Sequence, residues 1–482
     1  MSSNHQSPPP EETTPLLPRV EVAHEGESGR SGFHPRHFLH VLWRSSCAAS
    51  MLTNILWPFV PIAIVLQYAA DAPLWTFAVS YIGVIPSANL LGFAGQEFAR
   101  KMPKVAGILI ETTFGSVVEI ILLVTLIVKH NDKADMGEDD QEEEERNLIP
   151  IIQAAILGSI LTNLLLCLGL CFFFGGIHQS SQKFHAVVSE VGTGLLLVAA
   201  FGLLIPSAFY AALKTEASKT TDSGLRILHE TFTRANLDAD VLDISRATSI
   251  ALIVAFLLYI WYCASSHHSI FDEVIEADEH RDADREEDLE KPKFTLTETA
   301  LALVISLVCV TLLLIFLVDK IEDVVESGVP DQFLGLILLP LVEKAAEHLT
   351  AIDEAWDGVI NVALYHCLGP SIQTALFNGP LAVIIAWAMG KSLDLNFEIF
   401  MVALLVLSIL VVGNFLRDGE SNWLEGALLV VVYVIIGIAS WYYPNPDVAM
   451  TNGVDSAQIV HVAMSVETLK QLQDLLGFAE QQ

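Results

Sequence analysis

Eleven long apolar segments run through this chain and restrict it to very few folds. A helix needs roughly 20 mostly apolar residues to cross the hydrocarbon core of a bilayer. Helices and closed barrels satisfy every backbone hydrogen bond in lipid, and these segments lack the two-residue alternation of barrel strands. The sequence therefore predicts an all-α polytopic membrane protein with about 11 transmembrane helices. The predicted spans are residues 51–68, 75–93, 107–128, 148–175, 187–213, 248–265, 295–318, 333–352, 360–389, 397–414 and 423–443.

The charged residues are concentrated between the spans, and they indicate how the chain is oriented. The formal net charge is −32, with acidic runs at 138–145 and 272–290. Lys and Arg near helix ends decide topology, because they are retained on the cytosolic side, whereas acidic residues contribute little. Arg44, Lys101 and Arg417 all fall on the side of the N-terminus if every predicted span crosses the membrane. We therefore expect an integral membrane protein with a cytosolic N-terminus.

The acidic run at 272–290 divides the membrane region into two halves. The linker is either a solvated spacer or a strip that concentrates cations. In the N-terminal tail, Glu12, Leu16 and Leu17 resemble an acidic dileucine signal, which makes a sorting adaptor one expected partner, although so short a pattern also arises by chance. The expected divisions are a disordered cytosolic tail (1–35), a leading helix with a first repeat (36–265), an acidic cytosolic linker (266–293), a second repeat (294–445) and a C-terminal tail (446–482).

Two of the predicted spans carry a carboxylate near the middle. Glu119 lies in the segment 107–126, and Glu347 lies in the segment 333–352. An ionised group in hydrocarbon is costly, so such residues usually face a cavity, a pathway or each other. Each segment is followed by a second apolar segment that contains Gly and Ser, which indicates an internal repeat. Repeats whose helices meet at the midplane are a common plan of secondary transporters.

The residues around these carboxylates share their helical faces. Ser116 lies three residues before Glu119, and Glu343 and Lys344 lie four and three residues before Glu347, so each set faces one way. Acidic residues from opposed helices suit a hard cation, and the same carboxylates can take protons when the metal leaves, which gives antiport. Glu119 and Glu347 are therefore the predicted metal ligands. The alternative is that each carboxylate is inert and only holds helices together.

Further polar residues interrupt otherwise apolar spans. His348 is either a proton carrier or gate, since its pKa ordinarily lies near physiological pH, or a packed and hydrogen-bonded side chain. For the others, lining the path and binding a neighbouring helix are both open. These candidate pathway residues are Gln153, Ser159, Asn163, Ser371 and Gln373.

Several function classes are excluded or disfavoured. No Gly-x-x-x-x-Gly-Lys-Ser/Thr motif accompanies the helices, so a primary pump is not expected. The six cysteines show no paired spacing outside the spans. We therefore expect neither a disulfide framework nor a zinc site. Each cysteine is interpreted as a small buried hydrophobic residue. We expect no enzymatic activity, no cofactor and no nucleic acid. The expected partners are the lipid bilayer, inorganic cations and protons, and a homo-oligomer is left open.

A family resemblance extends from about residue 34 to residue 443. It rests on motifs such as Leu91-Gly92-Phe93-Ala94 in the first half and Ala345-Ala346-Glu347-His348 in the second. At these motifs the chain resembles the cation/proton exchanger (CAX) family of Ca²⁺/H⁺ antiporters, within the cation/Ca²⁺ exchanger superfamily. Further matching motifs are Thr113-Phe114-Gly115, Leu157-Gly158-Ser159-Ile160-Leu161-Thr162-Asn163, Gly335-Leu336-Ile337-Leu338-Leu339-Pro340, Ser371-Ile372-Gln373 and Asp418-Gly419-Glu420-Ser421-Asn422-Trp423-Leu424-Glu425-Gly426.

The resemblance implies both an architecture and an activity. The architecture is one leading helix followed by two inverted five-helix repeats. The activity is movement of Ca²⁺ or another divalent cation out of the cytosol against protons, in the membrane of a vacuole or another acidic compartment. Glu119 and Glu347 match the metal-binding glutamates of the family, and His348 matches the histidine beside the second one.

The chain departs from the family at both repeat centres. The family core is Gly-Asn-Ala-x-Glu, but Ser116 replaces the first Asn, and Glu343-Lys344 replaces the second Gly-Asn. Gln96 stands where the family usually has a glutamate, with Glu97 retained beside it, and both are further candidate gating or pathway residues. A charged Lys offers no acceptor oxygen, and its ammonium group could sit where the cation would. Three carboxylates against one ammonium still give a formal charge of about −2, so a divalent site is electrostatically possible.

Three hypotheses follow from these departures. The first is a CAX-type antiporter of Ca²⁺ or another divalent cation. The second is an antiporter of altered selectivity that exchanges Na⁺ or K⁺ for H⁺. The third is a degenerate relative without transport that serves a regulatory role.

Overall fold

The computed structural model describes residues 28, 30–102, 104–130, 147–179, 181–222, 234–263, 274, 278, 281 and 291–443. The predicted sorting signal at Glu12, Leu16 and Leu17 lies outside the described residues, as do the acidic run at 138–145, most of the linker at 272–290 and the tail at 446–482.

The described chain is almost entirely helical, as predicted. Helix occupies each of the predicted apolar segments, and eight helices are long and apolar enough to cross a membrane. The all-α polytopic fold is therefore confirmed, while the count of eleven spans and the repeat arrangement stay predictions. The helices are α1 (Pro35–Arg44), α2 (Ala48–Thr53), α3 (Phe59–Ala69), α4 (Pro73–Ala99), α5 (Lys104–Lys129), α6 (Ile149–Leu161), α7 (Leu168–His178), α8 (Ala186–Asp222), α9 (Arg234–Trp261), α12 (Leu296–Asp319), α13 (Ile321–Glu326), α14 (Asp331–Phe333), α15 (Leu339–Trp356), α16 (Ile360–Gln373), α17 (Gly379–Ala388), α18 (Ile399–Phe415) and α19 (Trp423–Trp441).

The helix ends follow local sequence rules. Thr295 and Glu298 form a capping box at the start of α12, in which each side chain accepts from the backbone N–H of the other residue. The Asn422 side chain accepts from Leu424 N and Glu425 N at the start of α19. A short antiparallel ladder pairs Gln182 with Ser421, and joins β1 (Gln182–Lys183) to β2 (Glu420–Ser421).

Three spans contain a π-helical stretch near the centre of the bundle. These stretches are η3 (Thr162–Cys167) between α6 and α7, η5 (Leu334–Leu338) before α15, and η6 (Thr374–Asn378) between α16 and α17. A π turn widens the helix, changes its register and often marks a functional site. The Leu338 carbonyl in η5 accepts from the Tyr81 hydroxyl of α4 at 2.9 Å, which supplies a partner from outside the helix.

The helices cross at very short distances where glycine removes the side chain. A Cβ on Gly158 in α6 would lie 2.4 Å from the carbonyl oxygen of Leu336 in η5. A Cβ on Gly335 in η5 would lie 2.6 Å from that of Ala154 in α6. The two helices therefore pack backbone to backbone, in the manner of small-residue contacts between membrane helices.

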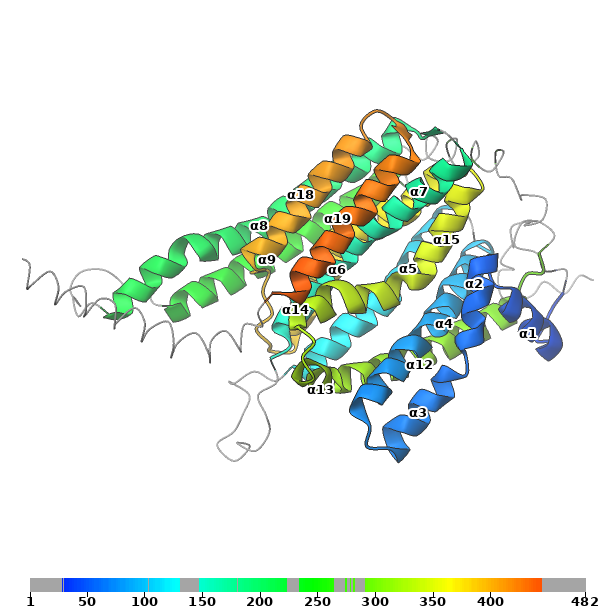
Figure 1. The fold of residues 1–482 in the computed structure, drawn as a ribbon, viewed down its shortest axis with the longest axis horizontal. Helices are drawn as coiled ribbons and strands as arrows, with labels where there is room; N and C mark the ends of the chain where they lie inside the picture. Colours follow the sequence, from blue (N-terminus) through cyan, green and yellow to red (C-terminus); the bar gives the residue numbers. More distant parts are fainter. Residues whose placement is uncertain are drawn as a thin grey trace, which may run out of the picture.

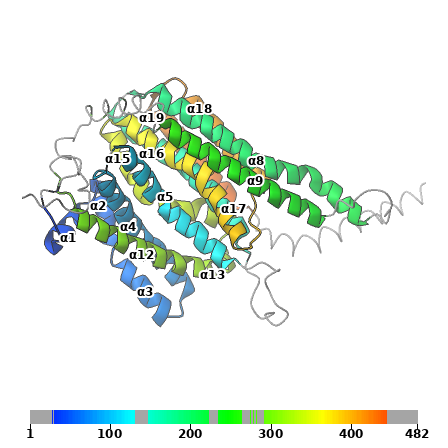
Figure 2. The ribbon, with the colours of Figure 1, turned by 180° about the vertical axis from the view of Figure 1, so that it is seen from behind.

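The helices form two flanks around a central group. On one flank α3 and α12 pack against α4, and on the other α8 packs against α9 and α18. Helices α5, α6, α15 and α16 lie between them, while α8 and α9 project beyond the rest of the bundle (Figures 1 and 2). One linker residue is seen to be anchored rather than solvated: Asp278 is buried and accepts from Asn361 N and Nδ2, at 2.8 and 2.9 Å, at the start of α16.

Candidate cation site

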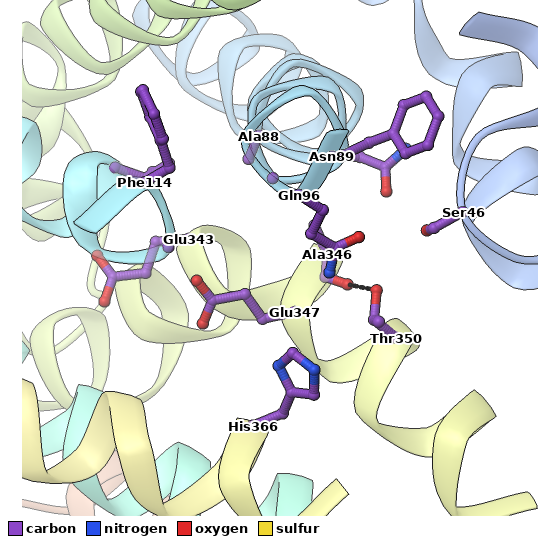
Figure 3. A pocket seen from close by; sticks show the side chains of 14 residues that line it. Ser46, Ala88, Asn89, Gln96, Phe114, Glu343, Ala346, Glu347, Thr350 and His366 are labelled. Atoms are coloured by element: carbon purple, nitrogen blue, oxygen red, sulfur yellow. Dashed lines mark hydrogen bonds between the residues drawn. The ribbon is translucent and has the colours of Figure 1, made fainter. Parts of the chain in front are cut away.

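A small cavity lies between α4, α5, α15 and α16 (Figure 3). Its walls include Gln96 from α4, Phe114 and Gly115 from α5, and His366 from α16. The cavity offers about 40 Å³ to the centres of water molecules, and roughly 10–15 Å³ of such space is enough for one water. It is therefore large enough to hold water inside a mostly apolar bundle.

Two carboxylates of α15 border this cavity. Glu343 and Glu347 are one helical turn apart, and their carboxylates lie close together in Figure 3, with His366 beside Glu347. The Glu343 residue is 4% exposed, whereas the Glu347 side chain is 19% exposed. Glu347 is thus the carboxylate more open to water, and Glu343 is the more enclosed one.

Gly115 makes room for Glu347 on the opposite wall. A Cβ at position 115 would lie 2.8 Å from Oε1 of Glu347, well inside van der Waals contact. The absence of a side chain therefore lets the Glu347 carboxylate approach the backbone of α5. This close approach brings the Glu347 carboxylate of α15 against α5, the helix that also carries Glu119.

Glu119 and Lys344 form a buried ion pair beside these carboxylates. The Lys344 Nζ lies 3.1 Å from Glu119 Oε2 and 3.7 Å from Glu347 Oε2. Both side chains of the closer pair are only 2% exposed. Glu119 Oε2 also accepts from Thr374 Oγ1 at 2.8 Å and from Asn378 Nδ2 at 3.0 Å, both in η6. One ammonium group thus bridges carboxylates from two helices, at the place where the sequence predicts a cation.

Several oxygens around this ion pair make no hydrogen bond of ordinary geometry with the described residues. They are Glu119 Oε1, both carboxylate oxygens of Glu343, Glu347 Oε2 and Asn378 Oδ1. Buried acceptors without donors are rare in folded proteins, and each calls for an explanation such as a water or an ion. Carboxylate and amide oxygens are the ligands that hard cations such as Ca²⁺ prefer. These oxygens are therefore a candidate ligand set.

The structure brings together most of the residues predicted to bind the cation. Glu119, Glu343, Lys344 and Glu347 are joined by the contacts described above, and Ser116 is buried at 3% exposure one turn before Glu119 on α5. The assignment of these residues as cation or proton ligands stays a prediction, because proximity alone does not establish binding.

The neighbours Gln96 and Glu97 face different surroundings. Gln96 lines the cavity. Glu97 is buried elsewhere, where its Oε2 accepts from Phe294 N at 3.0 Å and lies 3.5 Å from Lys101 Nζ. Burial lowers the pKa of Lys101, and the neighbouring Glu97 acts in the opposite direction. The Glu97 carboxylate therefore connects the segment before α12 to α4, and the pathway role of both residues stays a prediction.

The remaining predicted pathway residues mostly bridge helices. His348 Nε2 lies 3.0 Å from Asn163 Oδ1, and both residues are buried. Ser159 Oγ and Thr374 Oγ1 are 3.4 Å apart, which connects α6 to η6 beside Glu119. Away from the cavity walls, the Ser371 hydroxyl donates to Cys367 O, the Gln153 side chain donates to Asp394 Oδ1 at the end of the bundle, and Gln373 is buried.

Three site residues were not predicted from the sequence. Thr374 and Asn378 donate to Glu119, and His366 lines the cavity beside Glu347. A usable signal existed for the first two, because both are polar residues of an apolar span and lie four positions apart. His366 carried no comparable signal, since it follows Tyr365 and precedes Cys367 in a span of mixed character.

A polytopic helical bundle in which carboxylates of two helices meet a buried ammonium group is typical of an integral membrane transporter of ions. The chain belongs to the sodium/calcium exchanger protein family, whose model matches residues 72–264 and 299–442. It is 32% identical over 396 residues to vacuolar cation/proton exchanger 2 of Arabidopsis thaliana, with 82% of this chain and 81% of the relative covered. It is 30% identical over 500 residues to a vacuolar calcium ion transporter of Cryptococcus neoformans, with 87% and 78% covered. The predicted resemblance to cation/proton exchangers is confirmed.

Solved structures show the same fold. The structure of native YfkE superposes with a TM-score of 0.61 at 24% identity, and covers 81% of this chain and 100% of that one. The crystal structure of the H⁺/Ca²⁺ exchanger CAX gives a TM-score of 0.53 at 13% identity, with 88% and 98% covered. At these identities the similarity establishes the shared architecture.

Proposed function

We propose that this chain is a secondary active antiporter that moves Ca²⁺ or another divalent cation out of the cytosol in exchange for protons. The observation that carries the proposal is the convergence of Glu119 of α5 and Glu347 of α15 on one buried cation, the ammonium of Lys344. The relatives named as vacuolar cation/proton exchangers and vacuolar calcium ion transporters support the substrates. They also support a vacuole-like acidic membrane as the location.

In this proposal Lys344 holds the place of the transported ion. An ammonium group between two carboxylates satisfies them when no metal is bound, and it has to move before a divalent ion can be held there. Glu119, Glu343 and Glu347 against Lys344 leave a formal charge of about −2 when all are ionised, which one divalent ion neutralises. Protonation of the same carboxylates when the metal leaves would couple metal release to proton uptake.

A second candidate is exchange of Na⁺ or K⁺ for protons. The observation in its favour is again Lys344, because a fixed positive charge 3.1 Å from Glu119 weakens the attraction for a doubly charged ion more than for a singly charged one. A regulatory relative without transport is the third hypothesis. The three hypotheses differ in the ion that drives proton movement: a divalent cation in the first, Na⁺ or K⁺ in the second and no ion in the third.

The experiment is Ca²⁺ uptake into proteoliposomes with an imposed proton gradient. Wild type is compared with Glu343→Gly/Lys344→Asn, which restores the family pattern, and with Glu119→Gln, which removes a proposed ligand. Uptake by wild type that vanishes in Glu119→Gln and after collapse of the gradient supports the proposal. Uptake by the restored variant alone contradicts Ca²⁺ as the substrate of wild type, and Na⁺, K⁺ and Mn²⁺ are then tested for proton exchange.

Two finer assignments also belong to the proposal. We infer a cytosolic N-terminus, which is tested by protease access to an N-terminal tag in intact vesicles. We also infer that Glu12, Leu16 and Leu17 direct the chain to its compartment through a sorting adaptor. Replacement of both leucines by alanine should move a fluorescent fusion to another membrane, and an unchanged location would contradict the inference.

A further inference from the structure

Three cysteines from distant parts of the sequence meet inside the bundle. Cys167 ends η3, Cys171 lies one turn later in α7, and Cys367 comes from α16. The Sγ atom of Cys367 lies 3.4 Å from that of Cys167 and 3.9 Å from that of Cys171. All three sulfur atoms lie within 4.8 Å of one another. The cluster joins a helix that follows Glu119 to one that follows Glu347.

The spacing of the sulfurs fits a three-coordinate metal. A d¹⁰ ion with metal–sulfur bonds of roughly 2.3 Å, at the centre of a sulfur triangle, sets the sulfurs about 4.0 Å apart. The observed separations of 3.4 and 3.9 Å, with the third below 4.8 Å, lie around this value. The two measured separations are therefore close to those that a three-coordinate ion requires.

The surroundings select a soft ion. Each of the three cysteines is 0% exposed, and Leu164, Leu168 and Leu364 on the same helices are equally buried. Among the described residues, the group holds three sulfurs and no carboxylate or imidazole ligand. Thiolates select soft metals, whereas Ca²⁺ and Mg²⁺ require oxygen. Structural zinc is almost always four-coordinate, so three sulfurs without a fourth ligand favour a monovalent ion such as Cu(I).

We propose that Cys167, Cys171 and Cys367 form a binding site for one Cu(I) ion, distinct from the carboxylate site. Each thiol that binds as a thiolate releases its proton to the solvent, and no change of oxidation state is involved. Because Cys167 and Cys171 follow α6 and Cys367 lies in α16, the bound ion connects two spans and stabilises their packing. The proposal does not depend on which cation the carboxylates transport.

The test uses the full chain in detergent under reducing conditions. A background variant, Cys47→Ala/Cys263→Ala/Cys309→Ala, retains only the three clustered thiols, and its partner variant, Cys167→Ala/Cys171→Ala/Cys367→Ala, retains only the other three. Cu(I) is supplied from a coloured chelator that reports the metal it loses. We expect the background variant to take one equivalent of Cu(I) from the chelator and to develop an ultraviolet sulfur-to-copper absorption band. With Cu(I) bound, it should unfold at a higher temperature than without it. The partner variant should bind at least about tenfold more weakly, a loss of about 1.4 kcal/mol.

Competition separates this site from the carboxylates. Excess Ca²⁺ should leave the Cu(I) band unchanged, and Zn²⁺ should compete poorly. Absence of Cu(I) uptake by the background variant overturns the proposal, and so does equal uptake by the partner variant. If the triple replacement does not fold, Cys367→Ala in the background variant gives the same comparison, with Cys309→Ala in wild type as its folded control.

Discussion

The Nζ atom of Lys344 lies 3.1 Å from Oε2 of Glu119, so a residue of α15 supplies the positive charge that a carboxylate of α5 requires. Both side chains are 2% exposed. Two charges removed from water are stable only when they are close together and further hydrogen bonded. Thr374 and Asn378 supply those additional hydrogen bonds to Glu119. The arrangement gives the buried Glu119 carboxylate one positive partner and two hydrogen-bond donors.

Removal of one partner of this ion pair should destabilise the protein more than removal of both. Glu119→Gln or Lys344→Met leaves the other charge buried without its nearest partner of opposite sign. Loss of one partner of a buried ion pair lowers the free energy of unfolding by about 3–5 kcal/mol. The double variant Glu119→Gln/Lys344→Met should recover much of that loss. The measurement is a double-mutant cycle from unfolding in detergent.

The exposed pair Lys183 and Glu420, with side chains 74% and 49% exposed, is the control for this cycle. Exposed pairs contribute little, because water and salt screen them. We expect the double-mutant cycle at Lys183 and Glu420 to give an interaction free energy no larger than the experimental error. Strictly additive effects at Glu119 and Lys344 would show that the two charges do not depend on each other.

Gly115→Ala should disturb the site while the fold persists. The added Cβ would lie 2.8 Å from Glu347 Oε1, so the carboxylate has to rotate away from α5. We expect weaker cation binding, seen as a higher half-saturation concentration in uptake. Gly369→Ala, at a helical position with nothing within 4 Å of the added Cβ, is the matched control and should transport normally. If both variants had the same half-saturation concentration, the prediction that Gly115 makes room for the Glu347 carboxylate would be wrong.

Gly158→Ala should lower stability rather than alter the site directly. The new Cβ would meet the backbone carbonyl of Leu336 at 2.4 Å, and backbone cannot rotate aside as a side chain can. Overpacking of this kind costs roughly 1–3 kcal/mol, so the unfolding temperature in detergent should fall. Gly194→Ala in α8, with nothing within 4 Å, is the control and should be neutral or slightly stabilising. Unchanged stability of Gly158→Ala would contradict the close crossing of α6 and η5.

Asp394 should make stability depend on pH. Burial raises the pKa of this loop carboxyl from 3.8 to about 6. The hydrogen bonds that Asn396 N and the Gln153 side chain donate to it lower the pKa and so offset part of this effect. The folded protein therefore holds the proton more tightly than the unfolded chain does. The resulting stability is complete below pH 3.8 and is lost as the pH rises through about 6.

The measurement is the unfolding temperature of wild type and Asp394→Asn between these pH values. A shift of about two pKa units corresponds to roughly 3 kcal/mol, and partial solvent contact reduces this to about 1–2 kcal/mol. Asp394→Asn keeps an oxygen that can accept from Gln153, so its stability should vary less with pH. Parallel pH profiles for the two proteins would rule out Asp394 as the titrating group.

Much of the fold and the centre of the site followed from the sequence alone. Charged residues in apolar spans are rare, so Glu119, Glu347 and Lys344 stood out, and their helical spacing placed them on common faces. The separation of Gln96 from Glu97 could not be predicted, because adjacent residues of a helix point about 100° apart and either orientation fits the pattern.

Other features depended on contacts across the sequence. Thr374 and Asn378 carried a signal as polar residues of an apolar span, but their hydrogen bonds to Glu119 depend on how the π-helical stretch packs on α5. The cysteine cluster was missed because Cys367 is about 200 positions from Cys167, and sequence spacing detects only ligands that are near each other in the chain. The packing of α16 on α7 creates that proximity.

In the proposed exchange, Lys344 acts as a tethered competitor for the transported ion. A group attached to the same chain acts at an effective concentration of millimolar order, which does not change with dilution. In the proposed exchange, the apparent affinity for a cation is the intrinsic affinity multiplied by the fraction of time that the ammonium is away from the carboxylates. The same proposal sets the threshold for transport inside the protein, because the cation concentration has to exceed the level at which Lys344 competes with it for the carboxylates.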